Sequence, residues 1–418
     1  MGHDGIREPG SDGVTAFVNA ARFVAIEGRD KNVQRRISEK LSLALQTRNV
    51  AFLIGAGASY YLKAPQIRNM SPSDLSELAS SHGQALSRAE TEVISRLMGG
   101  AATIDLEHLL AELSTAIRYT SSAYANVGSN RADERRLLTD VRAKLNRALA
   151  LACDLGNAGD ASSLLRPHNV FFSRALSSRR ADLSRLRVFT TNYDLAIERS
   201  LDVLGIEYID GFAGTIDRTL RMDVYSREVY TVAASTSERR PRRLQDFLYL
   251  YKVHGSLNWR SRPGVGDNET RVAQEASYNT TPVDDLALIY PTPQKESETL
   301  GYPYSDLLRA FGAVLAEPDS ALLVIGYGFS DEHINRIIVQ SLAANQTLAI
   351  FIVAPFDLMI QVDSSPALNT ESSIGKFVSS RPDARISAIA GSASAFERFG
   401  ETFFRASQLD LLDQEEKP

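Results

Sequence analysis

Cysteine is almost absent from the sequence. Cys153 is the single cysteine among 418 residues, so the chain cannot form a disulfide bond within itself. It also cannot build a zinc cluster from pairs of cysteines, which is a frequent kind of structural zinc site. We therefore expect no zinc and no other metal ion in this protein.

Long hydrophobic runs are also missing. The longest apolar stretches, Ala321 to Phe329 and Leu348 to Phe356, are about half as long as the ~20 residues needed to cross a bilayer. Residues 1–12 contain Gly, Asp and Pro without an apolar core, which fits a flexible N-terminus and not a secretory signal. We expect a cytoplasmic protein that does not enter a membrane.

An excess of basic residues is missing as well. The formal net charge is −5, which argues against a protein that binds nucleic acid over a broad surface. One basic cluster, Arg239 to Arg243, holds four arginines around Pro241. We interpret it as a solvated loop, with contact to an acidic partner or to nucleic acid as the alternative. Any role of nucleic acid is therefore expected to be indirect.

The most informative stretch that is present runs from Asn49 to Ser59, with the sequence NVAFLIGAGAS. Its apolar part predicts a strand buried on both faces of a parallel sheet. Gly55 and Gly57 allow a tight turn and allow a diphosphate to approach the amides that begin the next helix. Tyr60 occupies the position of the third glycine of a G-x-G-x-x-G motif, and no acidic residue about twenty positions later is placed to hold a ribose. Taken alone, the loop is equally well explained as a turn without a ligand.

Apolar runs alternate with helical spacing along most of the chain. Strands are predicted at 50–54, 186–191, 205–209, 247–253, 286–290, 321–325 and 348–353, and helices include 14–24, 33–45 and 393–409. This alternation predicts an α/β fold with a Rossmann-like parallel sheet flanked by helices. Residues 215–246 are expected to form an insertion, and residues 264–281 a loop.

Residues 69–185 differ from the rest of the chain. Leucines recur there every three or four positions and strand signals are nearly absent, which predicts an all-helical subdomain inserted into the sheet domain. The predicted domains are residues 1–12 as a flexible N-terminus, 13–68 with 186–418 as the sheet domain, and 69–185 as the helical insertion. His82, His108 and His168 lie in or near these helices without metal-ligand spacing, so we expect them at the surface or at the edge of the core.

Distinctive residues follow five of the predicted strands. They are Gly55 to Ser59, Asn192 to Asp194, His254 with Gly255, Gly326 to Ser330, and Ala354 with Pro355. In an open parallel sheet the ligand binds at the carboxyl ends of the strands, so we expect these groups to meet at one edge. For His254 taken alone, the alternative to a functional role is that it is an ordinary histidine at the end of a strand.

Four motifs resemble those of the sirtuin, or silent-information-regulator-like, family of NAD-consuming enzymes. They are GAGAS with the downstream Pro65 and Arg68, TNYD at 191–194, VHGS at 253–256 and GYGFSD at 326–331. The resemblance implies that the Rossmann-like domain binds NAD as its substrate, with His254 as the catalytic base and Asn192 as a second catalytic residue. It implies NAD-binding roles for Gly55, Ala56, Gly57, Ser59, Arg68, Asn192, Asp194, Gly326 and Ser330.

These residue types suit the chemistry that the resemblance implies. Cleavage of the bond between nicotinamide and ribose passes through an oxocarbenium-like centre. An Asn amide can orient a water molecule or another nucleophile on the open face of that centre. A histidine can accept a proton near neutral pH without a large change in its pKa.

The sequence also departs from the family. Protein deacylases of this family carry a zinc module of paired CxxC motifs, which a single cysteine cannot supply. The helical insertion takes the place of that module and leaves water as the simplest acceptor, which favours a NAD glycohydrolase that releases nicotinamide and ADP-ribose. A deacylase or ADP-ribosyltransferase, and a non-catalytic module that binds NAD or ADP-ribose to regulate a partner, are the alternatives.

Zinc-free sirtuin-like domains with a helical insertion are typical of bacterial anti-phage defence systems, in which NAD depletion stops the infected cell. The pattern resembles the sirtuin-like subunit that works with a HerA-type ATPase. This resemblance implies a homo-oligomer whose activity is controlled by assembly, by a HerA-type ATPase or by another defence partner.

Overall fold

A computed structural model gives the structure of the chain. It describes residues 16–19, 31–62, 72–99, 106–121, 131–154, 161–231, 241–264, 270–275, 286–288, 301–355, 358–362 and 365–404.

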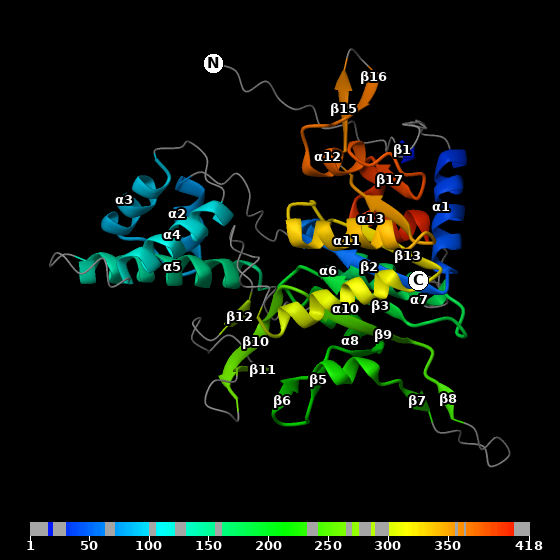
Figure 1. The fold of residues 1–418 in the computed structure, drawn as a ribbon, viewed down its shortest axis with the longest axis horizontal. Helices are drawn as coiled ribbons and strands as arrows, with labels where there is room; N and C mark the ends of the chain where they lie inside the picture. Colours follow the sequence, from blue (N-terminus) through cyan, green and yellow to red (C-terminus); the bar gives the residue numbers. More distant parts are fainter. Residues whose placement is uncertain are drawn as a thin grey trace, which may run out of the picture.

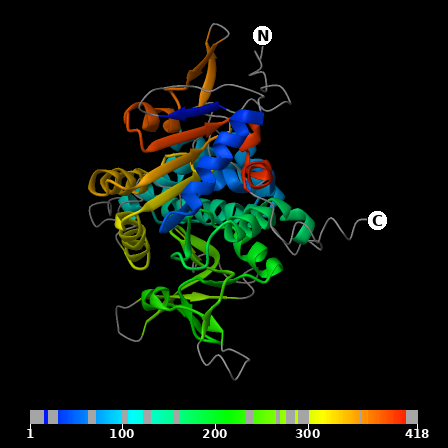
Figure 2. The same cartoon turned by 90° about the vertical axis from the view of Figure 1, so that its right-hand side faces the viewer.

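The centre of the molecule is a sheet of eight described strands (Figures 1 and 2). In spatial order they are β1 (Ala16–Asn19), β17 (Ile386–Ala390), β14 (Ala349–Val353), β13 (Ser320–Ile325), β2 (Asn49–Ile54), β3 (Leu186–Thr190), β9 (Phe247–Lys252) and β4 (Glu207–Ile209). All neighbours run parallel except β1, which pairs antiparallel with β17. The α/β fold with a Rossmann-like parallel sheet, predicted from the alternating pattern, is confirmed.

Helices cover both faces of this sheet. One core lies beneath α10 (Tyr304–Ala316), α11 (Glu332–Ala344) and α12 (Ser373–Ser379), and the other beneath α1 (Lys31–Leu45), α7 (Arg166–Ser177), α8 (Ala196–Leu204) and α13 (Phe396–Phe403). Every residue of β2 and β13 is buried, because these central strands are covered on both sides. That double burial explains why their sequences are continuous apolar runs.

The helix predicted at residues 14–24 was wrong over the part that the structure describes. Residues 14–24 have helical spacing, but Ala16–Asn19 form β1, with Ala16 opposite Ala390 and Asn19 opposite Ser387. Pairing with the edge of the sheet outweighs the local spacing. The second predicted helix, at 33–45, is confirmed as α1.

A second, smaller sheet lies next to the end of β9. Its order is β12 (Leu286–Leu288), β10 (Gly255–Pro263), β11 (Thr270–Gln274), β6 (Arg218–Leu220) and β5 (Phe212–Ala213). The strand predicted at 286–290 therefore belongs to this sheet and not to the large one. The loop predicted at 264–281 was wrong over β11, whose Val272 joins the core beside Trp259.

The helices after β2 form a bundle that lies to one side of the large sheet (Figure 1). It consists of α2 (Pro72–Ser81), α3 (Arg88–Leu97), α4 (Leu106–Ser121) and α5 (Arg131–Ala152). Leucines such as Leu109, Leu113 and Leu145 make its core, which is separate from the cores of the sheet. In contrast, Phe171 and Phe172 of α7 belong to a core of the sheet. The separate helical core thus ends with α5, earlier than the residue 185 that the sequence gives as the boundary.

Short elements complete the described chain. They are the 3-10 helices η1 (Ala56–Leu62), η3 (Met222–Ser226) and η5 (Ser392–Ser394), the helix α6 (Ala161–Leu164), and the hairpins of β7 (Tyr230–Thr231) with β8 (Arg242–Arg243) and of β15 (Met359–Val362) with β16 (Ser365–Leu368). None of the described helices combines the length and the apolar character needed to cross a membrane.

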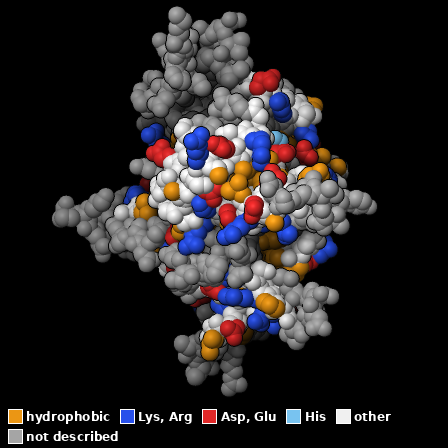
Figure 3. Space-filling model, turned by 90° about the vertical axis from the view of Figure 1, so that its left-hand side faces the viewer, with side chains coloured by type: hydrophobic (Ala, Val, Ile, Leu, Met, Phe, Trp, Pro, Cys, Tyr) orange, Lys and Arg blue, Asp and Glu red, His pale blue; other side chains and the backbone are white. Residues whose placement is uncertain are grey.

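The basic cluster predicted as a solvated loop is only partly described. Arg239 and Arg240 lie outside the described residues, whereas Arg242 and Arg243 form β8. Arg243 forms an ion pair of 2.7 Å with Glu228, which also pairs with Arg185 at 2.9 Å. On the face drawn in Figure 3, the described Lys and Arg side chains are interspersed with Asp and Glu, without one large basic area.

Candidate functional site

The carboxyl ends of four central strands meet at one edge of the large sheet. Ile54 of β2 pairs with Thr190 of β3 and with Ile325 of β13, and Thr190 also pairs with Lys252 of β9. The residues that follow these strands are therefore neighbours in space, as the sequence predicts for motifs that follow parallel strands.

A connected chain of hydrogen bonds links the first two motifs. Asn192 donates from Nδ2 to Ser59 Oγ at 3.1 Å, and the Ser59 hydroxyl donates to Asp194 Oδ2 at 2.9 Å. All three side chains are buried. The Oδ1 atom of Asn192 is buried and has no hydrogen-bond partner among the described residues. A buried amide oxygen without a partner is costly, so this atom is a candidate acceptor for a ligand or for water.

The backbone around Asn192 is held in place by Thr190. The Thr190 hydroxyl donates to Ile54 O at 2.9 Å and accepts from the Asn192 amide at 3.0 Å. Asp194 is fixed in the same way, because its Oδ1 accepts from the Ala196 amide at 2.9 Å. These bonds tie the turn after β3 to the end of β2.

A buried ion pair lies next to this turn. Lys252, the last residue of β9, donates to Glu198 Oε1 at 2.8 Å and also to the backbone carbonyl of Asp194. Burial raises the pKa of Glu198 above its ordinary value, although the charge and hydrogen bond of Lys252 oppose that shift. The ammonium group thus anchors both α8 and the Asp194 backbone.

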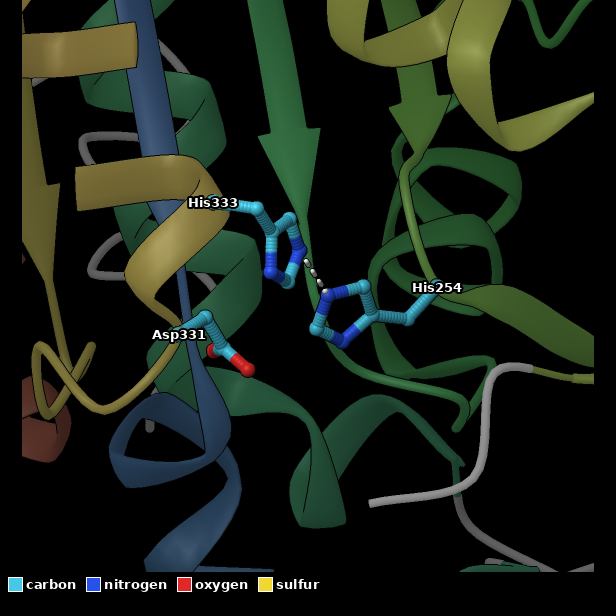
Figure 4. A group of neighbouring side chains, drawn as sticks. All are labelled: His254, Asp331 and His333. Atoms are coloured by element: carbon cyan, nitrogen blue, oxygen red, sulfur yellow. Dashed lines mark hydrogen bonds between the residues drawn. The ribbon is translucent and has the colours of Figure 1, made fainter. Parts of the chain in front are cut away.

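His254 lies in the turn between β9 and β10 and faces a second histidine (Figure 4). Its Nε2 atom is 3.4 Å from Nε2 of His333, in the first turn of α11. Asp331, the N-cap of α11, completes a group in which one ligand atom of each residue lies within 4.8 Å of the others. The strand-end position predicted for His254 is observed, but its two neighbours were not predicted.

The glycine-rich turn is in close contact with the turn after β13. The Gly55 amide donates to Ile325 O at 2.9 Å, and the Gly57 amide donates to Gly326 O at 2.8 Å. A Cβ atom on Gly55 would lie 2.7 Å from Gly326 O, and one on Gly57 would lie 2.8 Å from Gly326 Cα. The close approach of two backbones therefore requires glycine at both positions, whether or not a phosphate binds.

The other predicted NAD-binding residues differ in how exposed they are. Ala56 and Gly57 are exposed at the crest of the glycine-rich turn, and Gly326 and Ser330 are partly exposed in the turn after β13. An exposed crest is compatible with a ligand on its outer side. Arg68 lies outside the described residues, so its predicted role stays a prediction.

The backbone of the GYGFSD turn adopts the left-handed region at two residues. Gly326 has φ of 63°, which glycine adopts readily, whereas Phe329 has φ of 55°. For an aromatic residue this conformation costs about 1–2 kcal/mol. Phe329 is held there by a ring contact with Phe377 at 4.3 Å between centroids. Packing thus fixes the conformation of the turn that leads into Asp331 and His333.

His168 is fully buried, contrary to the prediction of a surface or core-edge position. Its Nδ1 atom lies 2.6 Å from the Tyr61 hydroxyl, and its ring contacts Phe396 at 4.6 Å between centroids. Burial lowers the pKa of His168 from 6.5 to about 4, although the charge of Asp194 opposes the shift. The imidazole is therefore neutral at physiological pH and belongs to the core.

The comparison with protein families covers most of this edge, because residues 186–374 match the model of the SIR2-like domain. The matched part contains Asn192, Asp194 and His254 together with the turn after β13, whereas the glycine-rich turn precedes it. The match supports a sirtuin-like family and a NAD-related function for this region.

The comparisons with solved structures and with curated proteins give no further support for a function. A solved structure described as a mutant of Sir2 homologues in complex with 2′-O-acetyl ADP ribose is similar at 13% sequence identity and a TM-score of 0.32, covering 84% of this chain and 94% of that chain. No curated protein matches the chain in sequence.

Several residues at this edge were missed by the sequence-based prediction. Lys252 had a detectable signal, because a lysine inside a strand buried on both faces requires a partner. Asp331 and His333 also had one, because both closely follow a predicted strand end. Their proximity to His254 depends on how α11 packs against the sheet, which local sequence does not specify.

Proposed function

We propose that this protein cleaves NAD to nicotinamide and ADP-ribose, with water as the acceptor. One observation carries the proposal: Asn192, Asp194 and His254 are all buried and follow the carboxyl ends of the neighbouring strands β3 and β9, within the region that matches the SIR2-like domain. Buried polar groups at the carboxyl edge of a parallel sheet are the usual components of a ligand site.

The arrangement of Asn192 suits the reacting end of NAD. Its Nδ2 is held by Ser59, and its Oδ1 is a buried acceptor without a partner in the part of the chain that the structure describes. A ribose hydroxyl or the attacking water would supply the missing donor. Because Ser59 and Asp194 fix the amide in one orientation, it can position that donor without reorganising during the reaction.

His254 is proposed as the general base. It lies at the end of β9, whose neighbour β3 leads directly into Asn192. An imidazole at this place can accept the proton from the ribose hydroxyl or from water as the oxocarbenium-like centre is captured.

The diphosphate is assigned to the exposed side of the two turns. Gly55 and Gly57 already donate their amides to backbone carbonyls, so these two glycines act by allowing the close approach of the turns. Ala56 and Arg68 are the proposed contacts with the diphosphate, and Gly326 and Ser330 are the proposed contacts with the adenosine end. Arg68, which lies outside the described residues, is the proposed cation for the pyrophosphate charge.

Water is the favoured acceptor because the chain has no paired cysteines for the zinc module of the family's deacylases. The helical bundle α2–α5 follows the glycine-rich turn instead. The proposed biological role is depletion of NAD in anti-phage defence, by a cytoplasmic homo-oligomer that is controlled by a HerA-type ATPase or another partner. This role rests on the resemblance of the sequence to such systems.

The test is release of nicotinamide and ADP-ribose from NAD by the purified chain, with and without a HerA-type ATPase. We expect His254→Ala and Asn192→Ala to lower the rate about 10²- to 10⁴-fold, the usual range for loss of a general base. His108→Ala, which removes an exposed imidazole in the helical bundle, is the matched control.

Three results would contradict the proposal. An acyl-ADP-ribose product or a modified protein would identify a transferase. NAD binding without any product, alone or with the ATPase, would favour a regulatory module. Equal rates for wild type and both site variants would place the reaction elsewhere in the chain.

A further inference from the structure

Three side chains that can bind a metal ion converge at the carboxyl edge of the large sheet from two separate elements. His254 follows β9, whereas Asp331 and His333 begin α11 (Figure 4). They are 3%, 6% and 9% exposed, and one ligand atom of each lies within 4.8 Å of the other two. Two imidazoles and a carboxylate are a ligand set that suits Zn²⁺ and neighbouring divalent transition metals.

The spacing of the two imidazoles matches that of metal ligands. Zinc–nitrogen bonds of about 2.0–2.1 Å in tetrahedral geometry place two ligand nitrogens about 3.3–3.4 Å apart. The Nε2 atoms of His254 and His333 are 3.4 Å apart. These two nitrogens are therefore already at the separation of a metal-bound pair.

The backbones that carry these ligands are fixed by other contacts. The Val253 amide, directly before His254, donates to Thr190 O at 3.0 Å. The Asp331 carbonyl accepts from the Asn335 amide at 3.0 Å and from the Tyr327 hydroxyl at 3.2 Å. The spacing of the ligands is thus set by the sheet and by α11, as a metal site requires.

The position of Asp331 supports the same interpretation. Asp331 is the N-cap of α11, and its carboxylate belongs to the same group as the two imidazoles. A negative charge there offsets part of the charge of a bound cation in buried surroundings.

We propose that His254, Asp331 and His333 bind one divalent transition-metal ion, Zn²⁺ in preference to Mg²⁺, and that the bound ion inhibits the enzyme. Binding occupies the Nε2 lone pair of His254, so this imidazole no longer accepts a proton. The inhibitory part rests on the proposed NAD cleavage, whereas the binding part does not. The low cysteine count that led to the expectation of no metal excludes a cysteine cluster but not a site of this kind.

Metal binding is tested with Co²⁺ as a spectroscopic probe of the full chain after treatment with EDTA. We expect one Co²⁺ per chain, a visible ligand-field band typical of tetrahedral coordination, and displacement by Zn²⁺ but not by Mg²⁺. His333→Ala and the nearly isosteric Asp331→Asn should each weaken binding at least about 10-fold. His108→Ala is the control for loss of an imidazole, and circular dichroism checks that each variant is folded.

The proposal is overturned if folded wild-type protein binds Co²⁺ no more tightly than folded His333→Ala. A second measurement addresses inhibition. Zn²⁺ should lower NAD cleavage by wild type, EDTA should restore it, and His333→Ala should need at least about 10-fold more Zn²⁺ for the same fractional loss of its own rate. Metal binding without any change in NAD cleavage would contradict the inhibitory part. If no NAD is cleaved under any condition, the Co²⁺ titration still decides whether the site exists.

Discussion

The carboxyl edge of the large sheet and the helical bundle α2–α5 differ in what they bury. The bundle buries leucines such as Leu109 and Leu145, whereas the edge buries Asn192, Lys252 and His254. Burying an apolar side chain stabilises the fold, but burying a polar group costs free energy unless it has a partner. The bundle is thus organised for stability, and the edge keeps polar groups that stability alone does not require.

The two regions meet at an apolar contact. Tyr193, between Asn192 and Asp194, packs with Leu257, and Ala150 and Cys153 at the end of α5 pack against this pair. The bundle therefore contacts the residue that separates two of the predicted NAD-binding side chains. The comparison becomes testable by changing each region separately.

The largest expected effect on stability comes from the edge. Lys252→Met leaves the buried carboxylate of Glu198 without its partner at 2.8 Å. Removing one partner of a buried ion pair lowers the free energy of unfolding by about 3–5 kcal/mol, which urea denaturation would measure. The double variant with Glu198→Gln should recover part of the loss. Equal stability of Lys252→Met and wild type would show that the pair contributes nothing to the fold.

A large effect is also expected in the bundle, without an effect on the site. Leu145→Ala creates a cavity in the α2–α5 core and should lower the free energy of unfolding by about 2–5 kcal/mol. At a temperature where the variant stays folded, its affinity for NAD should equal that of wild type. A large loss of affinity would instead show that the bundle positions the edge, through Tyr193 or another contact.

A smaller effect is expected where two turns of the edge meet. Gly326→Ala places a Cβ atom 2.4 Å from the Ala58 nitrogen, at a backbone φ of 63°. The left-handed conformation and the overpacking together should lower the free energy of unfolding by about 2–4 kcal/mol. Gly328→Ala is the matched control, because no atom of the described residues lies within 4 Å of its added Cβ. Similar destabilisation in both variants would rule out the close approach as the cause.

The smallest effect depends on pH and concerns His168. The folded pKa of about 4 lies below the ordinary 6.5, so the unfolded chain binds more protons between these values. The free energy of unfolding should therefore fall as pH is lowered from about 6.5 towards 4, by at most about 3 kcal/mol for this group. His168→Phe removes the titrating group from an aromatic cluster, and its stability should depend less on pH in this window. An unchanged pH dependence would contradict a buried neutral imidazole.

Much of the sheet was predictable because its central strands are buried on both faces. Strands such as β2, β3, β9 and β13 give continuous apolar runs that end at polar or glycine residues, so the edge that carries Asn192 and His254 follows from the order of motifs. The edge strand β1 was not predictable, because four residues with helical spacing become a strand only by pairing with β17.

Local sequence also failed where contacts join distant segments. The second sheet depends on pairing between β10 and β12 across a long connection. The meeting of His254 and His333 depends on the packing of α11, 79 positions later in the chain. For the glycine-rich turn the motif was recognised, but its contact with Gly326 appears only in three dimensions.

The most direct test of the central claim is the binding of NAD to wild type, Asn192→Ala, Ser59→Ala and the double variant, measured by calorimetry under conditions without turnover. Because Asn192, Ser59 and Asp194 form one chain of hydrogen bonds, each single variant should weaken binding, and the double variant should weaken it by less than the sum of the two losses. Unchanged affinity in all three variants would contradict the assignment of this edge as the NAD site.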